Sequence, residues 1–222
     1  MSPDWSASNP ANRWMLVLSR QFTQSFSPQL LVFGADQHSP QVGINLTHLL
    51  NDATVIYLEW SGGRGRTLES QVAGEAGQSA FRSQLATGLT YTAPFRLSVT
   101  LEYEQNDAAP DGSQWNELRN GAVTEFARYL SYSGRQQELA TRHALFTYVS
   151  WKDLFVHNLD VAAFSRTALE DHSRVSWLEA RYHWQQLDVA IQWQASSGAS
   201  RTVFGASAES RRWQVLFACY FP

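Results

Sequence analysis

The sequence predicts an all-β fold, an antiparallel up-and-down transmembrane β-barrel, and three observations support this prediction. Short segments throughout the 222 residues alternate apolar and polar side chains with a period of two, as β-strands do. The apolar sets end in aromatic residues, as in the last segment, where Trp213 and Phe221 flank Val215 and Phe217. Short turns alternate with long polar loops, as in barrels that have lipid outside and water inside.

Periodicity and turn residues predict eleven strands. The strands are expected at 13–22, 28–35, 41–49, 54–62, 79–91, 95–105, 142–152, 157–168, 173–184, 187–196 and 211–221. The terminal strand should run toward the periplasm, and eleven antiparallel strands then make the first strand run the same way. Closed bacterial barrels normally have an even number of strands. We therefore expect about 11–12 strands in residues 13–222, with the hypothesis that they form the C-terminal part of a larger barrel.

The connections predict which end of the barrel faces outward. The short ones, near 23–27, 50–53, 92–94, 153–156 and 185–186, are expected on the periplasmic side. The long ones, at 63–78, 106–141 and 197–210, are expected outside. Within 106–141, Trp115, Leu118, Ala122, Phe126 and Leu130 recur at spacings of three and four, which predicts a helix over 114–131 in an external loop. The alternative is a further strand over 121–132.

Residues 1–12, with Pro3 and Pro10, predict a flexible N-terminal segment. This segment lacks a basic region followed by an apolar core, so it is not a signal peptide. Because an outer-membrane protein must be exported, we expect that a signal was removed or that the chain begins within a longer protein.

Composition excludes several classes of protein. No apolar run approaches 18 residues, which excludes a helical membrane protein. The net charge of −3 gives no basic field, so no nucleic-acid partner is expected. Cys219 is the only cysteine, so the chain forms no internal disulfide. Lys152 is the only lysine among the 17 basic residues, and arginines suit bidentate pairs in a polar lumen.

The predicted strands place a set of charged residues on the face opposite the apolar one. These candidate pore-lining residues are Arg82, Arg96, Glu102, Glu104, Asp160, Arg166, Glu179, Arg181, Asp188 and Arg212. Charges on an inner wall either line a hydrated path or form a structural ladder of salt bridges, and the sequence leaves both roles open. Because both signs occur, we predict no strong selectivity for anions or cations.

Aromatic residues near strand ends predict contacts with the two membrane interfaces. The candidates are Tyr91, Tyr103, Trp184, Trp193, Trp213 and Phe221. They complete the pattern of an apolar outer band with aromatic girdles.

Catalytic and metal-binding patterns are weak. The sequence contains no Gly-x-Ser-x-Gly motif, and its six histidines lack the spacing of a metal site. We therefore predict no enzymatic activity, no metal and no cofactor. A Ser–His pair at the barrel rim is the less favoured alternative, with His143, His157, His172 or His183 as its base.

Over most of its length the chain resembles Gram-negative outer-membrane β-barrels of the porin or alginate-export-like class. The resemblance is carried by LATGLTY at 85–91, LSVTLEY at 97–103, LEARY at 178–182 and the terminal strand that ends in an aromatic residue. In that class the last residue is typically Phe or Trp and is read by the barrel-assembly machinery. Here Phe221 is followed by Pro222, a departure from that signal.

The function predicted from these patterns is a channel of the bacterial outer membrane that passes small or medium polar solutes through a charged lumen. The expected partners are outer-membrane lipid, lipopolysaccharide, an unidentified solute and the barrel-assembly machinery. The alternatives are a non-conducting scaffold or adhesion barrel and a lipid hydrolase at the barrel rim. A soluble β-sandwich or lipocalin-like barrel would instead bury the apolar face and expose the charged one.

Overall fold

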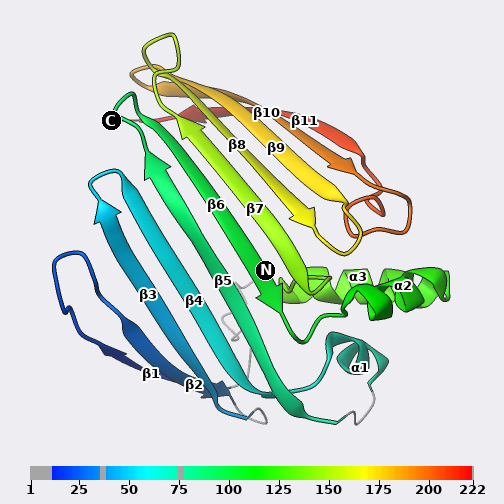
Figure 1. The fold of residues 1–222 in the computed structure, drawn as a ribbon. Coiled ribbons are helices and arrows are strands. Elements are labelled where there is room, and N and C mark those ends of the chain that lie inside the picture. Colours follow the sequence, from blue (N-terminus) through cyan, green and yellow to red (C-terminus); the bar gives the residue numbers. More distant parts are fainter. Residues whose placement is uncertain (1–11, 36–38, 75–77, 222) are drawn as a thin grey trace, which may run out of the picture.

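The computed structural model describes residues 12–35, 39–74 and 78–221, and its main feature is one curved antiparallel sheet (Figure 1). Eleven strands follow one another across the sheet in chain order. They are β1 (Arg13–Ser19), β2 (Gln29–Ala35), β3 (Gln41–Asn51), β4 (Thr54–Gly65), β5 (Ala80–Thr92), β6 (Leu97–Asn106), β7 (His143–Trp151), β8 (Leu159–Ala168), β9 (Arg174–His183), β10 (Leu187–Ser197) and β11 (Arg211–Cys219). All eleven predicted strands are confirmed.

The sheet has two edges, β1 and β11, and over the described residues it does not close on itself. Every neighbouring pair is antiparallel, so the two edge strands run in the same direction. The larger barrel proposed from the sequence stays a prediction. The predicted flexible segment 1–12 lies outside the described residues, apart from Asn12.

The two ends of the sheet differ, as the connection lengths predict. At one end, which we call the turn end, short segments at 20–28, 52–53, 93–96, 152–158 and 184–186 join the strands. At the other, the helix end, the connections 66–79 and 107–142 carry three helices, α1 (Leu68–Ala73), α2 (Gly112–Asn120) and α3 (Val123–Gln136) (Figure 1). None of these helices has the length and hydropathy needed to cross a membrane.

The single helix expected over 114–131 is wrong in its extent, because the segment forms α2 and α3 with a break between them. Gly121 has extended backbone angles, so it ends α2, and α3 begins after Ala122. Asp111 starts α2 with a capping box, in which its side chain accepts from the backbone of Gln114 while the Gln114 side chain accepts from Asp111 N. The alternative strand over 121–132 is also wrong, and α1 was not predicted.

The three helices form a small dry core, which we call the cap. Trp115 of α2 is fully buried against Phe126 and Tyr129 of α3, with ring centroids 5.5 and 6.3 Å apart. Leu68 of α1 is also buried in this cluster. Because Phe126 and Tyr129 are three residues apart, they share one helical face, and that face meets Trp115.

The sheet exposes its apolar face. Register pairs Val189 with Phe217 and Ile191 with Val215 on one face of β10 and β11. Phe217 is 70% exposed and Ile191 52% exposed. A soluble β-domain would bury such a face, whereas the wall of a membrane barrel directs it to lipid. We call this face the outer face.

Aromatic pairs mark both ends of the outer face. Near the helix end, the rings of Trp60 and Phe81 are 6.3 Å apart and those of Trp193 and Trp213 6.2 Å. Near the turn end, Phe95 pairs with Trp151 at 5.6 Å and Tyr182 with Trp184 at 4.4 Å. Two such bands match the aromatic girdles of membrane barrels.

Candidate functional site

The candidate site is the inner face, the face of the sheet opposite the exposed apolar one. Register places nine of the ten predicted lining residues there: Arg82, Glu102, Glu104, Asp160, Arg166, Glu179, Arg181, Asp188 and Arg212. The tenth, Arg96, lies in the turn before β6, where its positive φ of 62° stops the strand from beginning earlier. Their part in a pore stays a prediction.

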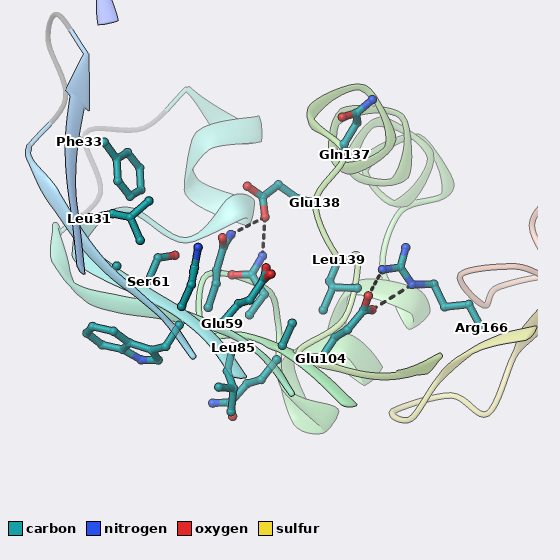
Figure 2. A pocket seen from close by; sticks show the side chains of 17 residues that line it. Leu31, Phe33, Glu59, Ser61, Leu85, Glu104, Gln137, Glu138, Leu139 and Arg166 are labelled. Atoms are coloured by element: carbon teal, nitrogen blue, oxygen red, sulfur yellow. Dashed lines mark hydrogen bonds and ion pairs between the residues drawn. The ribbon is translucent and has the colours of Figure 1, made fainter. Parts of the chain in front are cut away.

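A bidentate ion pair crosses three strands of the inner face toward the helix end. The Arg166 guanidinium on β8 donates from Nε to Glu104 Oε2 on β6 at 2.9 Å, and its Nη2 donates to Glu104 Oε1 (Figure 2). The strand between them, β7, presents Ala144 in that row, opposite Glu104 and next to Ala168. Because Ala144 is small, the arginine reaches across the intervening strand.

A second ion pair lies closer to the turn end. Arg181 donates to both carboxylate oxygens of Glu179, at 2.9 and 3.1 Å, and Gln192 Nε2 donates to Glu179 at 2.5 Å. Arg181 also lies 3.8 Å from Asp188. The inner wall therefore carries charges of both signs that largely neutralise each other.

Tyr57 joins β4 to β6 over a glycine. Its hydroxyl donates to Glu102 Oε2 at 2.5 Å, although β5 lies between the two strands. The β5 residue directly between them is Gly88. A Cβ there would lie 2.4 Å from Leu101 O and 2.7 Å from the Tyr57 hydroxyl oxygen. The absence of a side chain at Gly88 thus makes room for this contact.

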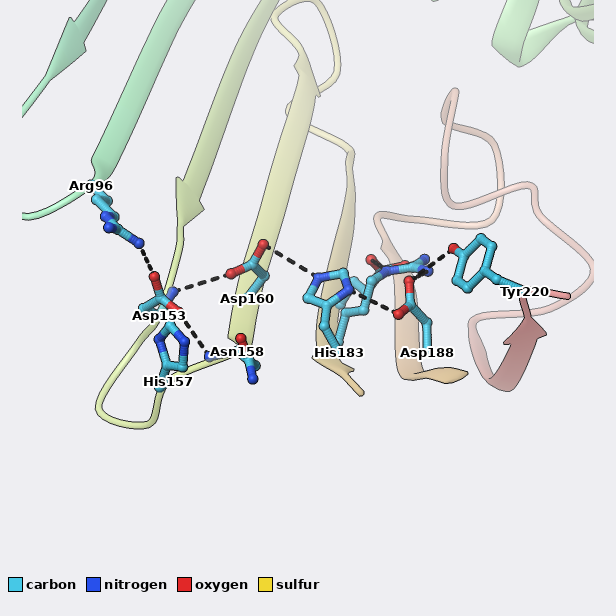
Figure 3. A network of polar contacts seen from close by, with 10 residues as sticks. Arg96, Asp153, His157, Asn158, Asp160, His183, Asp188 and Tyr220 are labelled. Atoms are coloured by element: carbon cyan, nitrogen blue, oxygen red, sulfur yellow. Dashed lines mark hydrogen bonds and ion pairs between the residues drawn. The ribbon is translucent and has the colours of Figure 1, made fainter. Parts of the chain in front are cut away.

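At the turn end, a chain of polar contacts runs across the strands (Figure 3). His183 lies between two carboxylates, with Nε2 3.5 Å from Asp160 Oδ2 and Nδ1 3.0 Å from Asp188 Oδ1. The Tyr220 hydroxyl donates to Asp188 Oδ2 at 3.1 Å. These contacts join β8, β9, β10 and the residue that follows β11.

The same chain continues into the turn before β8. Asp153 accepts from Asn158 N at 2.7 Å, pairs with Arg96, and lies 3.1 Å from His157 Nδ1. The backbone hydrogen bond from Asn158, followed by the positive charge of Arg96, lowers the pKa of the Asp153 carboxyl. Asp153 is therefore ionised in the neutral range, as its role in holding the turn requires.

Glu138 fixes the cap to the inner face. This residue follows α3, and its carboxylate accepts from Gln84 Nε2 on β5 and from Asn106 Nδ2 on β6, both at 2.7 Å (Figure 2). Burial raises the pKa of Glu138. A cavity of about 290 Å³ lies beside it, between the wall and the end of α3, and Phe33, Glu104 and Arg166 also line it.

Two other loops hold the cap from the side. Asp171, in the connection after β8, accepts from Trp115 Nε1 at 3.1 Å and from Val203 N at 2.8 Å. Arg201, in the connection after β10, donates to the carbonyl oxygens of Arg119 at 2.7 Å and Gly121 at 3.0 Å. The cap is therefore a fixed structure over the inner face and not a free loop.

The predicted interface aromatics lie at both ends of the sheet. Tyr103, Trp193 and Trp213 are toward the helix end, while Tyr91, Trp184 and Phe221 are at the turn end. Within the described ranges, no group of three or more His, Cys, Asp or Glu side chains is arranged to hold a metal ion.

Sequence reasoning missed Tyr57, Gln84, Asn106 and Glu138. Tyr57 lies on the inner face of β4, but an aromatic residue at a strand position gives no sign of a partner two strands away. Glu138 lies in a loop, where alternation gives no direction to a side chain. No signal in a single sequence would have found these contacts.

Comparisons with known proteins give the fold. No protein-family model and no curated sequence matches the chain. The crystal structure of Acinetobacter baumannii OccAB1 has a TM-score of 0.54 at 14% identity, covering 92% of this chain and 56% of that protein. Pseudomonas aeruginosa OccK11 (OpdR) has a TM-score of 0.52 at 13% identity, covering 94% and 58%. The NanC porin structure has a TM-score of 0.41 at 11% identity, covering 95% and 94%.

This chain therefore spans a little over half the length of the first two proteins. Its eleven-stranded antiparallel sheet shares the fold of these two proteins, which confirms the predicted fold class, the up-and-down antiparallel sheet of a transmembrane β-barrel.

Proposed function

We propose that this chain forms part of the wall of a channel in the outer membrane of Gram-negative bacteria. Small or medium polar solutes would diffuse through this channel. One observation carries the proposal: the outer face exposes apolar side chains such as Ile191 and Phe217, while the inner face carries ion pairs such as Glu104–Arg166. Lipid outside and water inside explain both faces together. The likeness to porin-type barrels supports the same conclusion.

Selectivity in this channel would come from size and from local contacts. Glu104 and Glu179 are paired with Arg166 and Arg181, and the inner face carries arginines and carboxylates side by side, so the wall offers no strong field of one sign. The cap, fixed by Glu138 at the helix end, would narrow the external mouth.

A bilayer recording tests the proposal. The full-length protein that contains this chain, refolded and inserted into a planar lipid bilayer, should give stepwise currents that pass both small cations and small anions. Folded, inserted protein without conductance would contradict a channel. That result would favour a non-conducting scaffold, an alternative supported by the clamped cap over the inner face.

We further propose that lipid and lipopolysaccharide surround the outer face and that the barrel-assembly machinery recognises β11. Phe221 follows this strand and is 90% exposed. Deleting Phe221 and Pro222 should lower the amount of protein that reaches the outer membrane, measured in membrane fractions. The absence of enzymatic activity also stays a prediction, and labelling of a serine by a fluorophosphonate would contradict it.

A further inference from the structure

Three strands of the inner face carry a row of aromatic side chains, which we call the aromatic strip: Phe146 and Tyr148 of β7, Phe164 of β8 and Trp177 of β9. Register puts Tyr148 opposite Phe164 and Phe164 opposite Trp177. The rings of Phe164 and Trp177 stack with centroids 5.6 Å apart and planes 21° apart. The rings of Phe146 and Phe164 are 5.9 Å apart.

The aromatic strip lies on the side of the sheet that faces the lumen. Phe146 lies directly opposite Glu102 on one neighbouring strand and Arg166 on the other. The four residues are therefore not part of the outer aromatic girdles. They are also not part of the cap core, which consists of other residues.

The structural requirements of the barrel wall do not explain why aromatic side chains occupy these four inner-face positions. The inner face of a water-filled barrel is generally polar, and apolar rings there keep part of their surface in water. All four side chains are partly exposed. Within the described ranges, no hydrogen bond to another protein group involves the Tyr148 hydroxyl or Trp177 Nε1, so both donors are available to water or to a solute.

Polar groups flank the aromatic strip on both sides along the barrel axis. Glu104–Arg166 lies toward the helix end and Glu179–Arg181, with Gln192, toward the turn end. Register places Glu179 opposite Ala162, four residues from Arg166 along β8. Four residues of strand measure roughly 13 Å. A solute lying along the aromatic strip would thus reach hydrogen-bonding groups at both ends.

The charge balance selects the kind of solute. Arg166 is paired with Glu104 and Arg181 with Glu179, while the carboxylate of Glu102, opposite Phe146, accepts a hydrogen bond from the Tyr57 hydroxyl, so each of these charged groups already has a protein partner. A bidentate pair uses only two of the five N–H donors of a guanidinium and only some of the acceptor sites of a carboxylate. The remaining donors and acceptors can form hydrogen bonds with hydroxyl groups of a solute. The complementary solute is therefore neutral, with a flat apolar face and hydroxyls around its edge.

We infer that the aromatic strip is a binding track for neutral pyranose sugars, above all oligosaccharides. The C–H faces of pyranose rings would stack on Phe164 and Trp177, and their hydroxyls would reach the flanking ion pairs, Gln192 and the Tyr148 hydroxyl. This inference rests on the proposed function, because the sugar reaches the aromatic strip through the lumen.

Binding to folded protein tests the aromatic strip independently of conduction. The full-length protein is folded in amine-oxide detergent micelles, because maltoside detergents would compete, and titrated calorimetrically with maltotriose. We expect weak saturable binding. Phe164→Leu and Trp177→Leu, which keep an apolar side chain but remove the ring face, should each weaken binding about tenfold, by analogy with base stacking on aromatic side chains.

The matched control is Trp193→Leu, because Trp193 lies on the outer face near the same strands. It should leave sugar binding unchanged. Sorbitol, which has hydroxyls but no ring, should not bind. Far-ultraviolet circular dichroism shows whether each variant is folded, and a variant that fails to fold is replaced by Phe146→Leu.

The outcomes separate this inference from the proposed function. Conductance without maltotriose binding, or binding that Phe164→Leu and Trp177→Leu leave intact, overturns the sugar track while the channel stands. The sugar track is also overturned if sorbitol binds as tightly as maltotriose. It is likewise overturned if the protein binds benzoate, a flat anion, and does not bind maltotriose. Ring-dependent maltotriose binding without conductance supports the aromatic strip as a sugar site and contradicts the channel.

Discussion

The cap and the sheet use the same apolar side chains in opposite ways. In the cap, Trp115 and Tyr129 are enclosed by other residues, as in an ordinary soluble domain. In the sheet, Trp213 and Phe217 are 69% and 70% exposed on the outer face. The cap has a dry interior because water surrounds it, whereas the sheet has an apolar exterior because lipid replaces water there. One chain thus folds in two solvents, water around the cap and lipid around the sheet. The position of a residue along the strand axis decides whether its apolar side chain is buried or exposed.

The largest expected effect is the loss of the cap core. Trp115→Ala should destabilise the cap by about 3–5 kcal/mol, the usual cost of removing a buried large aromatic residue. Hydrogen exchange of α2 and α3 should become faster while that of the central strands stays protected. Trp213→Ala, on the outer face, is the control and should leave exchange in the cap unchanged. Equal protection of the cap in both variants would contradict the separation into two regions.

A charge on the outer face tests the lipid side of the comparison. Ile191→Arg should cost about 2–4 kcal/mol if the residue faces the bilayer midplane. In a soluble sheet the same change at a 52% exposed position would cost almost nothing. The measurement is urea unfolding from lipid vesicles. Gln192→Arg, next in sequence but on the inner face, is the matched control and should be tolerated.

Gly88→Ala tests the packing on the inner face. The added Cβ would lie 2.4 Å from a backbone oxygen, so the strands must shift, and we expect a cost of about 1–3 kcal/mol. The matched control is Gly65→Ala, because a Cβ there has its nearest neighbour at 3.9 Å. Urea midpoints of the two variants should differ clearly, and equal midpoints would show that Tyr57 does not need this space.

The smallest expected effect is the pH dependence of the contact between the cap and the wall. Burial raises the pKa of Glu138 in the folded protein above its unfolded value. The folded state therefore binds the proton more tightly, so docking of the cap should be strongest below the unfolded pKa and weaken as pH rises through the folded pKa. Glu138→Gln should remove this dependence, measured by hydrogen exchange of residues 133–140 across acidic and neutral pH. An unchanged pH profile in the variant would show that another group is responsible.

Local patterns in the sequence predict the strands but not their distant partners. In a segment such as 187–196, apolar and polar residues alternate because one face of the strand meets lipid and the other meets water. This signal lies within the segment itself, so every strand could be located to within a few residues. The break at Gly121 was missed because the spacing of apolar residues continues across it, and only the turn of α3 back onto Trp115 reveals the two helices.

The candidate site could be predicted only in part, for the same reason. The sequence places Glu104 and Arg166 on one face, yet their pairing depends on the register of three strands and on the small Ala144 between them. Trp177 could be assigned to the inner face, but its stacking with Phe164 follows from the alignment of β8 and β9. Contacts that span tens of residues require the assembled sheet.

The common direction of β1 and β11 limits how a barrel can be completed. A strand edge facing hydrocarbon leaves its amide and carbonyl groups without partners, at several kcal/mol for each group. If the two edges met each other, the seam would be parallel. An entirely antiparallel cylinder needs an odd number of additional strands between them, whichever polypeptide supplies them. A second copy of this sheet, related by an axis along the membrane normal, would supply an odd number of strands, but the rotation preserves strand direction, so each β11 would meet a β1 that runs parallel to it.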